Sequence, residues 1–491
     1  MDRQANQLRT TNCELRTAAA MQRHRTANYK LTVRLVNRII TGLLSILLSG
    51  CVLSPLGPLD KAPRHEAKKS TGYHPFSWGI STSSLQYEDP DVSPGMKDYF
   101  VRDWDLLVKE KKAPVVGNAL SSWSHFDKDL EALQKIGVNA YRFSIEWARV
   151  EPQPGVYNEA AIRRYVEMVR QLKESGIEPV VCLWHFTFPA WLVDTNFGAQ
   201  SNWLHPLART HWNNYVTKMV KALSPYVKYY APQNEPNGQI LTAYIIGLWP
   251  PEHLLDFGGY KQAMIASEGM FRDAAGIIKK ITPDAKVMSI EAIPYWYRGP
   301  LDPGGIMYNT VEHNVFDHLD KIYDVCDIIG FNYYYSQVAG PLSMLTQSRH
   351  HGTHFSMMGW HIDPKALGKL IRKIGKRYDK PMMITENGIA DLNENQRIKY
   401  LHDHIEQIRI TMNEGYDVKG YFVWSLADNY EWHYGYVPKF GLSTMDPLTF
   451  ERVLKPSALY YRDVIKASER EGRIDPDPPS WRQFFLNVKK K

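Results

Sequence analysis

Two segments of the sequence each present a single glutamate directly after an apolar, β-capable run. The run Met382–Ile384 leads to Glu386 and reaches a glycine at Gly388, which is typical of a buried barrel strand that ends in a functional loop. The aromatic run Tyr226–Tyr230 leads in the same way to Glu235. Two carboxyl groups at strand ends favour glycoside hydrolysis, in which one acid donates a proton and the other attacks the sugar.

These glutamates need a scaffold that brings distant strand ends together. Apolar or aromatic runs recur eight times past residue 75, and amphipathic helical segments lie between them. This alternation predicts an α/β fold that is a single closed (β/α)8 TIM barrel over residues 73–470. No Gly-rich nucleotide fingerprint follows the first run, which disfavours a dinucleotide-binding fold. The expected strands begin near Phe76, Ala140, Pro179, Val227, Lys286, Asp327, Pro381 and Gly420.

The active site of such a barrel lies at the carboxyl ends of its strands, so the residues there form one set. Polar and aromatic side chains follow seven of the expected strands. A structural core has no reason to gather so many polar groups at one end, which indicates a binding site. The set comprises Gln86, Glu88, Arg142, His185, Asn234, Glu235, Asn332, Tyr334, Glu386, Trp424, Glu431 and Trp432.

From about Phe76 to Tyr461 the chain resembles glycoside hydrolase family 1, the β-glucosidase and β-galactosidase family of retaining enzymes. The motifs that carry the resemblance occur in order along nearly the whole expected barrel, which makes the signal specific. They are Phe76–Gln86, Tyr141–Arg149, His185–Trp191, Asn234–Pro236, Asn332–Tyr334, Thr385–Gly388 and Trp424–Trp432.

The resemblance implies a role for each glutamate. Glu235 would be the general acid and base, which protonates the glycosidic oxygen and later activates water. Glu386 would be the nucleophile that forms a covalent glycosyl-enzyme, with Arg142 and Tyr334 in contact with it. Retaining enzymes hold the two carboxyl groups about 5 Å apart. The substrate-binding residues would be Gln86, His185, Asn234, Asn332, Trp424, Glu431 and Trp432.

The implied substrates are terminal, non-reducing β-D-glucosyl, galactosyl or fucosyl residues of β-linked oligosaccharides or of aryl and alkyl β-glycosides. Glu431 and Trp432 stand where relatives that act on 6-phosphorylated sugars carry a serine and lysine cluster. A carboxylate repels a phosphate, so neutral sugars are favoured. The alternatives are transglycosylation at the same site and a catalytically weak, carbohydrate-binding lipoprotein. The presence of both Glu235 and Glu386 argues against the weak binding protein.

Composition limits the other classes of function. The net charge is +7, but residues 1–50 hold eight basic and two acidic side chains, so the rest is nearly neutral. A basic surface for nucleic acid is therefore not indicated. The four cysteines, Cys13, Cys51, Cys182 and Cys326, show neither a disulfide framework nor metal-ligand spacing. The expected chemistry requires no cofactor and no metal, and the oligomeric state is left open.

The amino terminus has the features of an export signal that ends in lipidation. Met21 is an alternative start, and a basic segment follows it. The apolar run Ile39–Leu48 is too short to cross a bilayer as a helix and suits a secretory signal. Leu48–Cys51 resembles a bacterial lipobox, in which Cys51 would become the lipid-bearing first residue of the mature protein. An ordinary cleaved signal and an uncleaved anchor are the alternatives.

The predicted location is therefore the cell envelope of an exporting bacterium. Residues 1–50 would form the signal segment, and residues 51–72, rich in proline, lysine and small polar residues, would form a lipid-anchored tether. No aspartate follows Cys51, which favours the outer membrane in a bacterium with two membranes. Residues 471–491 form a C-terminal tail, and the long segment Asp91–Ser124 is expected to contribute to a wall of the site.

Overall fold

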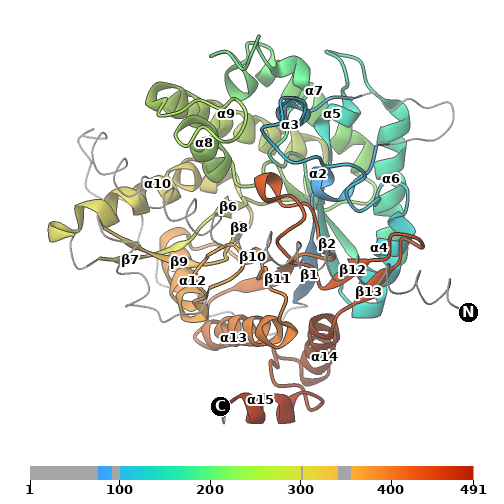
Figure 1. Cartoon of the computed structure of the whole chain (residues 1–491), viewed down its shortest axis with the longest axis vertical. Coiled ribbons are helices and arrows are strands. Elements are labelled where there is room, and N and C mark those ends of the chain that lie inside the picture. The colour runs from blue at the N-terminus through green and yellow to red at the C-terminus, as the bar shows by residue number, and fades with distance from the viewer. Residues whose placement is uncertain (1–75, 91–99, 300–301, 341–354, 490–491) are drawn as a thin grey trace, which may run out of the picture.

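The structure is a computed structural model that describes residues 76–90, 100–299, 302–340 and 355–489. Within these ranges, parallel strands form a central barrel that long helices surround, so the predicted (β/α)8 TIM barrel is confirmed (Figure 1). The predicted signal segment, Cys51 and the tether at 51–72 lie outside the described residues.

The barrel strands run parallel and pair in chain order. They are β1 Ser77–Ser81, β2 Ala140–Ser144, β3 Glu178–Cys182, β4 Tyr229–Ala231, β5 Lys286–Val287, β6 Glu291–Ala292, β8 Ile329–Asn332, β10 Met382–Asn387 and β11 Val418–Trp424. β1 pairs with both β2 and β11. The fifth barrel strand is divided, because β5 pairs with β4 whereas β6 pairs with β8. Between the two pieces, Met288 bridges to Ile328, which completes the ring.

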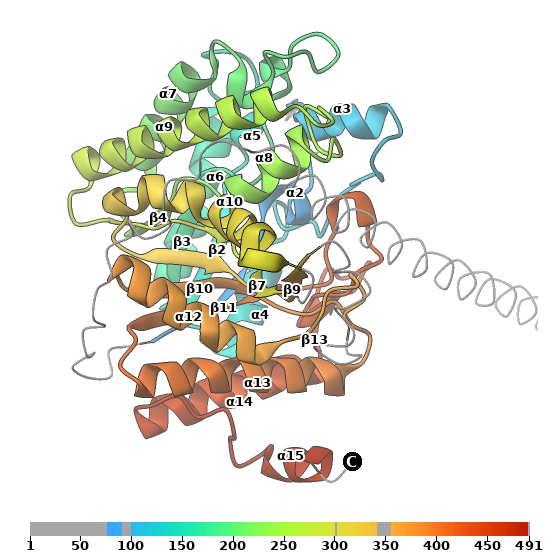
Figure 2. The ribbon, with the colours of Figure 1, turned by 90° about the vertical axis from the view of Figure 1, so that its left-hand side faces the viewer.

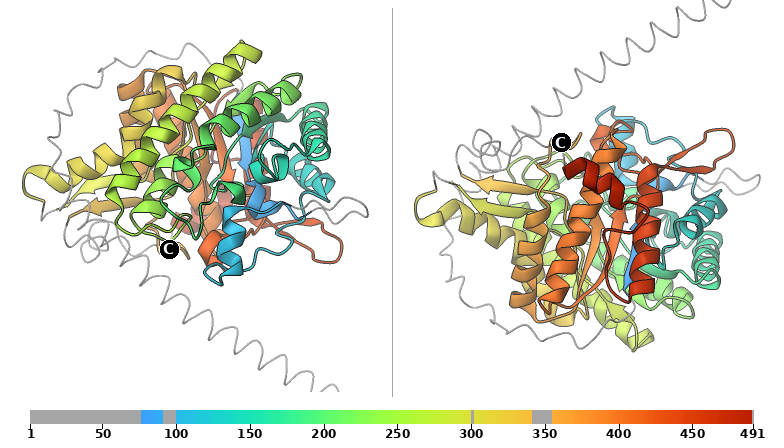
Figure 3. Two further views of the ribbon diagram at one scale, coloured as in Figure 1. Left: turned by 90° about the horizontal axis from the view of Figure 1, so that it is seen from above. Right: turned by 90° about the horizontal axis from the view of Figure 1, so that it is seen from below.

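Long helices cover the outside of the barrel, as the side and end views show (Figure 2, Figure 3). They are α4 Phe126–Ile136, α6 Glu159–Glu174, α7 Ala208–Leu223, α9 Phe257–Ile281, α10 Ile306–Ile322, α12 Pro364–Tyr378, α13 Glu394–Asn413 and α14 Pro456–Glu471. Local sequence sets their ends. The Asp363 side chain accepts a hydrogen bond from the Ala366 N–H before α12, and Gly137 ends α4 with a φ of 80°.

Shorter elements follow the carboxyl ends of the strands. The helices are α2 Ser84–Tyr87, α3 Asp103–Lys109, α5 Trp147–Val150 and α8 Pro236–Tyr244, with 3₁₀ turns at Ala190–Leu192, Asn202–Leu204, Pro303–Gly305 and Trp432–Tyr434; the turn Tyr323–Val325 instead joins α10 to the start of β8. Two small sheets are added, one of the parallel strands β7 Tyr295–Arg298 and β9 Ser336–Ala339, the other of the antiparallel strands β12 Ser443–Met445 and β13 Arg452–Leu454. These insertions build the walls around the barrel mouth.

The C-terminal tail carries a helix of its own, α15 Arg482–Lys489, beside α13 and α14 (Figure 2). Phe485 is buried, and its ring centroid lies 4.1 Å from that of His402 and 5.6 Å from that of Tyr460. His402 also contacts Asp477 through Nε2 at 3.1 Å. The first part of the tail is therefore packed against the barrel helices. Among the described helices, none has the length and apolar character needed to cross a membrane.

The barrel interior changes from apolar to polar towards the carboxyl ends of the strands. Ala140 of β2 and Phe422 of β11 belong to a buried apolar cluster drawn from several strands. Residues two apart on a strand share a face, so Arg142 follows Ala140 and Trp424 follows Phe422 on the inward side. The apolar cluster forms a floor, and the predicted site residues lie on it.

Candidate active site

Glu386, near the end of β10, is held by two hydrogen-bond donors. Tyr334 Oη donates to Glu386 Oε2 at 2.6 Å, and the Arg142 guanidinium forms an ion pair with Oε1. Both residues are buried, since Arg142 has no exposed side-chain surface and Glu386 is 4% exposed. A cation and a hydroxyl donor both stabilise a carboxylate. Both oxygens of the Glu386 carboxyl group are therefore bound by hydrogen-bond donors.

Glu235 lies in a different environment at the start of α8. Asn332 Nδ2 donates to Glu235 Oε1 at 2.7 Å, and Thr385 Oγ1 donates to Asn332 Oδ1 at 2.7 Å, which fixes the direction of that amide. The surrounding protein removes water from the carboxyl group, and the negative charge of Glu386 adds to this effect. Together they raise the pKa of Glu235 to about 8, against the lowering by Asn332 and Arg142. Glu235 therefore carries a proton at neutral pH.

A hydrogen-bond network joins the two glutamates. Arg142 Nη1 pairs with Glu386, and Arg142 Nη2 donates to Asn234 Oδ1 at 2.5 Å. Asn332 Nδ2 contacts Glu235 and also lies 3.2 Å from Asn234 Oδ1. Both carboxyl groups thus belong to one buried polar cluster at the carboxyl end of the barrel.

The neighbouring histidine is a neutral ring with a defined tautomer. Asn234 Oδ1 accepts from Arg142 and Asn332, so Asn234 Nδ2 is turned towards His185 Nε2 at 3.3 Å. An amide N–H donates, so Nε2 accepts and the ring proton resides on Nδ1. Burial and the Arg142 charge hold the pKa of His185 well below its usual value. His185 Nδ1 has no hydrogen-bond partner among the described residues.

Gln86 and Glu431 face each other across another part of the site. Gln86 Nε2 donates to the Tyr430 carbonyl at 2.7 Å and lies 3.2 Å from Glu431 Oε2, while Ser83 Oγ donates to Gln86 Oε1 at 2.6 Å. Burial, followed by the negative charge of Glu386, raises the pKa of Glu431 to about 8. The influence of Glu386 on Glu431 places both acids in one electrostatic environment.

Aromatic rings line the same region. The His185 ring is nearly parallel to the rings of Trp424 and Trp432, at centroid distances of 6.1 and 6.3 Å. Trp104 of α3 meets Trp432 edge-on at 4.9 Å. The described part of the expected wall segment therefore contributes through α3. Flat apolar rings of this kind are suited to stacking against the faces of sugars.

Sequence reasoning gave no role to the residues that hold the loop after Glu386. Asn387 Nδ2 donates to the Tyr333 carbonyl at 2.5 Å, and Tyr421 Oη donates to Asn387 Oδ1 at 2.8 Å. A Cβ atom on Gly388 would lie 2.0 Å from the Trp424 carbonyl oxygen. Asn387 thus ties neighbouring strands together, and Gly388 lets two chain segments approach closely. The Asn-Gly pair was the signal available in the sequence.

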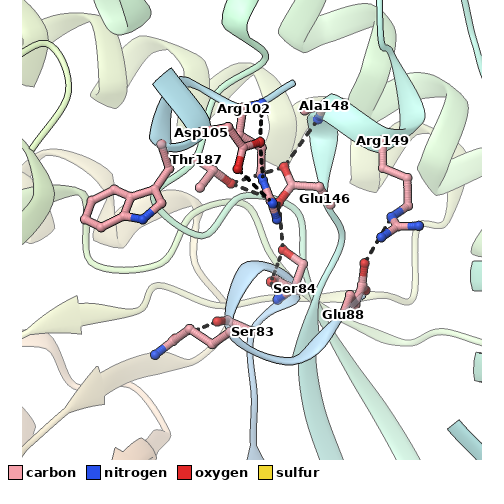
Figure 4. Close-up of polar contacts among 12 residues, drawn as sticks. Ser83, Ser84, Glu88, Arg102, Asp105, Glu146, Ala148, Arg149 and Thr187 are labelled. Atoms are coloured by element: carbon pink, nitrogen blue, oxygen red, sulfur yellow. Dashed lines mark hydrogen bonds and ion pairs between the residues drawn. The ribbon is translucent and has the colours of Figure 1, made fainter. Parts of the chain in front are cut away.

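Glu88 does not join the site, so the prediction that it lies with Gln86 is wrong. It pairs with Arg149 at 3.3 Å (Figure 4), and it accepts a hydrogen bond from Tyr165 Oη at 2.9 Å. Gln86 lies within α2, whereas Glu88 is its C-terminal cap with extended backbone. Because the backbone changes direction between them, the Gln86 side chain lies at Glu431 and the Glu88 side chain lies at Arg149.

A polar cluster around Glu146 joins segments near Gln86 and His185 (Figure 4). Glu146 accepts hydrogen bonds from Ser84 Oγ at 3.3 Å and Thr187 Oγ1 at 3.1 Å, and it lies 3.9 Å from the Arg102 guanidinium. Ser84 and Thr187 flank the segments that carry Gln86 and His185. The described ranges hold no group of three or more side chains suited to a metal ion.

Comparisons with known proteins agree with this geometry. The profile described as "Glycosyl hydrolase family 1" matches residues 70–289 and 308–470. A β-galactosidase of Sulfolobus acidocaldarius is 27% identical, over 82% of this chain and 98% of its own length. β-Glucosidase A of Thermotoga maritima is 25% identical, over 80% and 97%.

Solved structures give the same result. The β-glycosidase from Pyrococcus horikoshii superimposes with a TM-score of 0.70 at 28% identity, and the match covers 84% of this chain and 97% of that one. The family profile, the curated relatives and the shared fold extend over most of the barrel. The chain therefore belongs to glycosyl hydrolase family 1 and is an O-glycosyl hydrolase of the β-glucosidase type.

Proposed function

We propose that this protein is a retaining β-glycosidase that removes terminal, non-reducing β-D-glucosyl residues, or galactosyl or fucosyl residues, by double displacement. The observation that carries the proposal is the contrast between two glutamates in one hydrogen-bonded cluster. Glu386 is paired with Arg142 and Tyr334, whereas Glu235 has a pKa of about 8. Double displacement needs this pairing of an ionised nucleophile with a protonated acid.

In the first step, Glu386 attacks the anomeric carbon while Glu235 gives its proton to the glycosidic oxygen. The bond from carbon to the aglycone breaks as the bond to Glu386 forms. Esterification removes the negative charge of Glu386, which is one of the causes of the raised pKa of Glu235. Glu235 therefore loses its proton more readily in the glycosyl-enzyme and can take a proton from the attacking water.

The remaining groups suit the binding of a neutral sugar. His185 offers its unpartnered Nδ1–H to a hydroxyl, and Gln86 and Glu431 offer amide and carboxyl oxygens. The rings of Trp424 and Trp432 provide apolar surface for a sugar face. With its pKa raised to about 8, Glu431 is a neutral carboxyl group at pH 7 and supplies no positive charge for a sugar phosphate.

A panel of aryl β-glycosides tests the proposal, using the protein from residue 52 onward. The panel contains glucoside, galactoside, fucoside, mannoside and 6-phosphoglucoside, and proton NMR identifies the anomer that is released first. Hydrolysis of a neutral β-glycoside with initial release of the β-anomer is expected. Initial release of the α-anomer would exclude double displacement, and preference for the 6-phosphoglucoside would exclude the neutral-sugar assignment. Addition of a sugar acceptor shows how much product arises by transglycosylation.

The pH profile of kcat/KM is expected to fall on its basic side near pH 8. Glu235 must be protonated to act as the acid, so activity is present below its pKa of about 8 and is lost as the pH rises through that value. Above it, kcat/KM for an aryl β-glucoside should fall about tenfold per pH unit. Measurements from pH 5 to 10 check this, with circular dichroism to show that the fold persists. Constant activity up to pH 10 would contradict the assignment of Glu235.

We also propose that the protein is exported and anchored to the cell envelope by lipid on Cys51, in the outer membrane where there are two membranes. The proposal is supported by the apolar run and the lipobox-like Leu48–Cys51. Two or more lipid chains on one cysteine hold a protein stably at a membrane. A Cys51→Ser variant expressed with its signal is expected to lose incorporated palmitate and to leave the detergent phase. Cys13→Ser serves as the control and should behave like the parent; unchanged partitioning of Cys51→Ser would exclude lipidation there.

A further inference from the structure

A buried pair of ionisable groups lies behind the loop that carries Glu235. His318 of α10 places Nδ1 at 2.7 Å from Glu291 Oε1 of β6, and both side chains are completely buried. The second oxygen, Glu291 Oε2, is buried and has no hydrogen-bond partner among the described residues. Burying a carboxylate is costly unless a partner compensates its charge. His318 is the partner that the structure supplies.

Two further side chains connect this pair to the loop before Glu235. His318 Nε2 lies 3.2 Å from Ser267 Oγ of α9, and Ser267 Oγ donates to Gln233 Oε1 at 2.8 Å. Gln233 Nε2 in turn donates to the Ser267 carbonyl at 3.2 Å. Gln233, Ser267, Glu291 and His318 all have 0% exposure, so water does not compete for these contacts.

The directions of these hydrogen bonds determine where the protons reside. The Ser267 carbonyl only accepts, so Gln233 must turn Nε2 towards it and Oε1 towards the hydroxyl. The single hydroxyl proton of Ser267 is then used on Gln233, and Ser267 Oγ accepts from His318 Nε2–H. His318 Nδ1 faces Glu291 Oε1, and an ionised carboxylate only accepts. With Glu291 ionised, both ring nitrogens donate and His318 is an imidazolium.

The electrostatic surroundings agree with that protonation state. Burial acts to lower the pKa of His318, but the attraction of Glu291 outweighs it, and the pKa is raised above its usual value. Glu268 of α9 and Asp317 of α10 act in the same direction. The two partners therefore stabilise each other as an ion pair rather than as neutral groups.

A backbone hydrogen bond links the segment that carries Glu291 to Glu235. Glu235 has a φ of 45°, a left-handed conformation that is unfavourable for a residue with a Cβ atom, so surrounding contacts must hold it. Its N–H donates to the Ile290 carbonyl at 2.7 Å, directly before Glu291. Gln233 is anchored two residues before Glu235. These contacts fix the chain at Gln233 and at the Glu235 N–H, directly before the carboxyl-bearing side chain.

We propose that the His318–Glu291 pair is a positioning device for Glu235, which holds the acid/base loop in its left-handed turn and keeps a negative charge behind Glu235. The inference rests on the proposed function, because it assigns Glu235 the role of acid and base. His318 and Glu291 touch no substrate in this scheme. They act through Glu235 and are positioning residues.

Other charged groups also face Glu235, so the contribution of Glu291 must be separated from theirs. Glu386 of β10 raises the pKa of Glu235 and Arg142 of β2 lowers it, while Glu291 raises it. The tyrosines Tyr334 and Tyr335 lie close enough for Glu235 to raise their pKa values. Replacing Glu291 alone leaves those groups in place.

The test uses Glu291→Gln, which keeps the shape of the side chain and removes its charge. The basic limb of the kcat/KM profile should move down by about one pH unit. For an alkyl β-glucoside, whose leaving group needs full protonation, kcat/KM should fall about tenfold, whereas a 2,4-dinitrophenyl β-glucoside should change less than about twofold. Glu268→Gln is the matched control, since Glu268 lies near His318 without a hydrogen bond to it, and its profile should match the parent.

Two outcomes of the Glu291→Gln experiment would overturn the proposal. If Glu291→Gln leaves the basic limb of the pH profile in place and lowers kcat/KM equally for both substrates, the pair has only a structural role and the proposal fails. Should Glu291→Gln not fold, the double variant Glu291→Gln with His318→Gln replaces the ion pair by two amides of similar shape. The same shift and the same dependence on the leaving group are expected for it, and their absence overturns the proposal.

A measurement without turnover separates this inference from the proposed function. In the ¹⁵N-histidine NMR spectrum at pH 6.5, the ordinary pKa of a histidine side chain, His318 should show protons mainly on both ring nitrogens, and His318→Gln assigns its signal by removing it. A mainly neutral His318 ring at pH 6.5 overturns the inference even in an active enzyme. If the parent hydrolyses no β-glycoside, the proposed function fails, and the spectrum still decides whether the ion pair exists.

Discussion

Replacement of Glu386 by alanine is expected to lower kcat for an aryl β-glucoside by about 10⁴-fold or more, because it removes the group that is proposed to form the glycosyl-enzyme. Glu386 is the carboxylate that accepts from both Arg142 and Tyr334. Added azide is small enough to use the space left by the side chain. It should restore turnover and give the α-glucosyl azide, since a single displacement inverts the anomeric centre.

Glu386→Gln provides the matched test of folding. Glutamine retains two polar atoms beside Arg142, so the buried guanidinium keeps a hydrogen-bond partner, whereas alanine removes that partner and is expected to cost more stability. Glu88→Gln serves as the control for loss of a buried carboxylate, because Glu88 contacts Arg149 and Tyr165 outside the site. It should lower Tm and leave kcat near that of the parent. Activity of Glu386→Gln within about tenfold of the parent would contradict the nucleophile assignment.

Replacement of Glu235 by alanine is expected to have an effect that depends on the leaving group. For an alkyl β-glucoside, which needs a proton from Glu235, kcat/KM should fall by about 10²–10⁴-fold. For 2,4-dinitrophenyl β-glucoside, a good leaving group, formation of the glycosyl-enzyme should proceed and its hydrolysis should become slow. A burst of dinitrophenol followed by a slow steady state is the expected record in a stopped-flow measurement.

Azide distinguishes the two glutamates. With Glu235→Ala, azide attacks the glycosyl-enzyme on Glu386 and should give the β-glucosyl azide, the anomer opposite to that from Glu386→Ala. The basic limb of the pH profile should also disappear, because it arises from the ionisation of Glu235 near pH 8. If Glu235→Ala yields the α-azide, or loses activity equally with both leaving groups, Glu235 is not the acid and base.

The barrel and the positions of the two glutamates could be predicted because strand ends carry a local signal. Apolar runs that lead to a polar or aromatic residue mark Arg142, Asn332, Glu386 and Trp424, which lie within β2, β8, β10 and β11 at or near their carboxyl ends. Glu386 follows a register shift in β10 after Ile384, and the period of two along a strand places Arg142, Asn332 and Trp424 on the inward face. Local pattern and global fold agree at these positions, as they do in sequences that fold to one structure.

Other features depend on contacts between distant segments, which a single sequence does not reveal. Glu88 and Gln86 are two residues apart, yet the end of α2 sends Glu88 to Arg149, 61 residues further along the chain. The fifth strand reads as one continuous run but is divided between two neighbours. The His318–Glu291 pair joins a helix to this strand across 27 residues, and neither residue follows a pattern that indicates its partner.

The most direct measurement of the double displacement is capture of the covalent glycosyl-enzyme. The enzyme is incubated with 2-deoxy-2-fluoro-β-glucosyl fluoride. The fluorine at C2 slows formation and hydrolysis of the glycosyl-enzyme, and the anomeric fluoride remains a good leaving group, so the intermediate should accumulate. Intact mass spectrometry should show one added fluoroglucosyl group, and peptide mapping should place it on Glu386. An active enzyme that carries no label, or that carries it on another residue, would contradict the proposed mechanism.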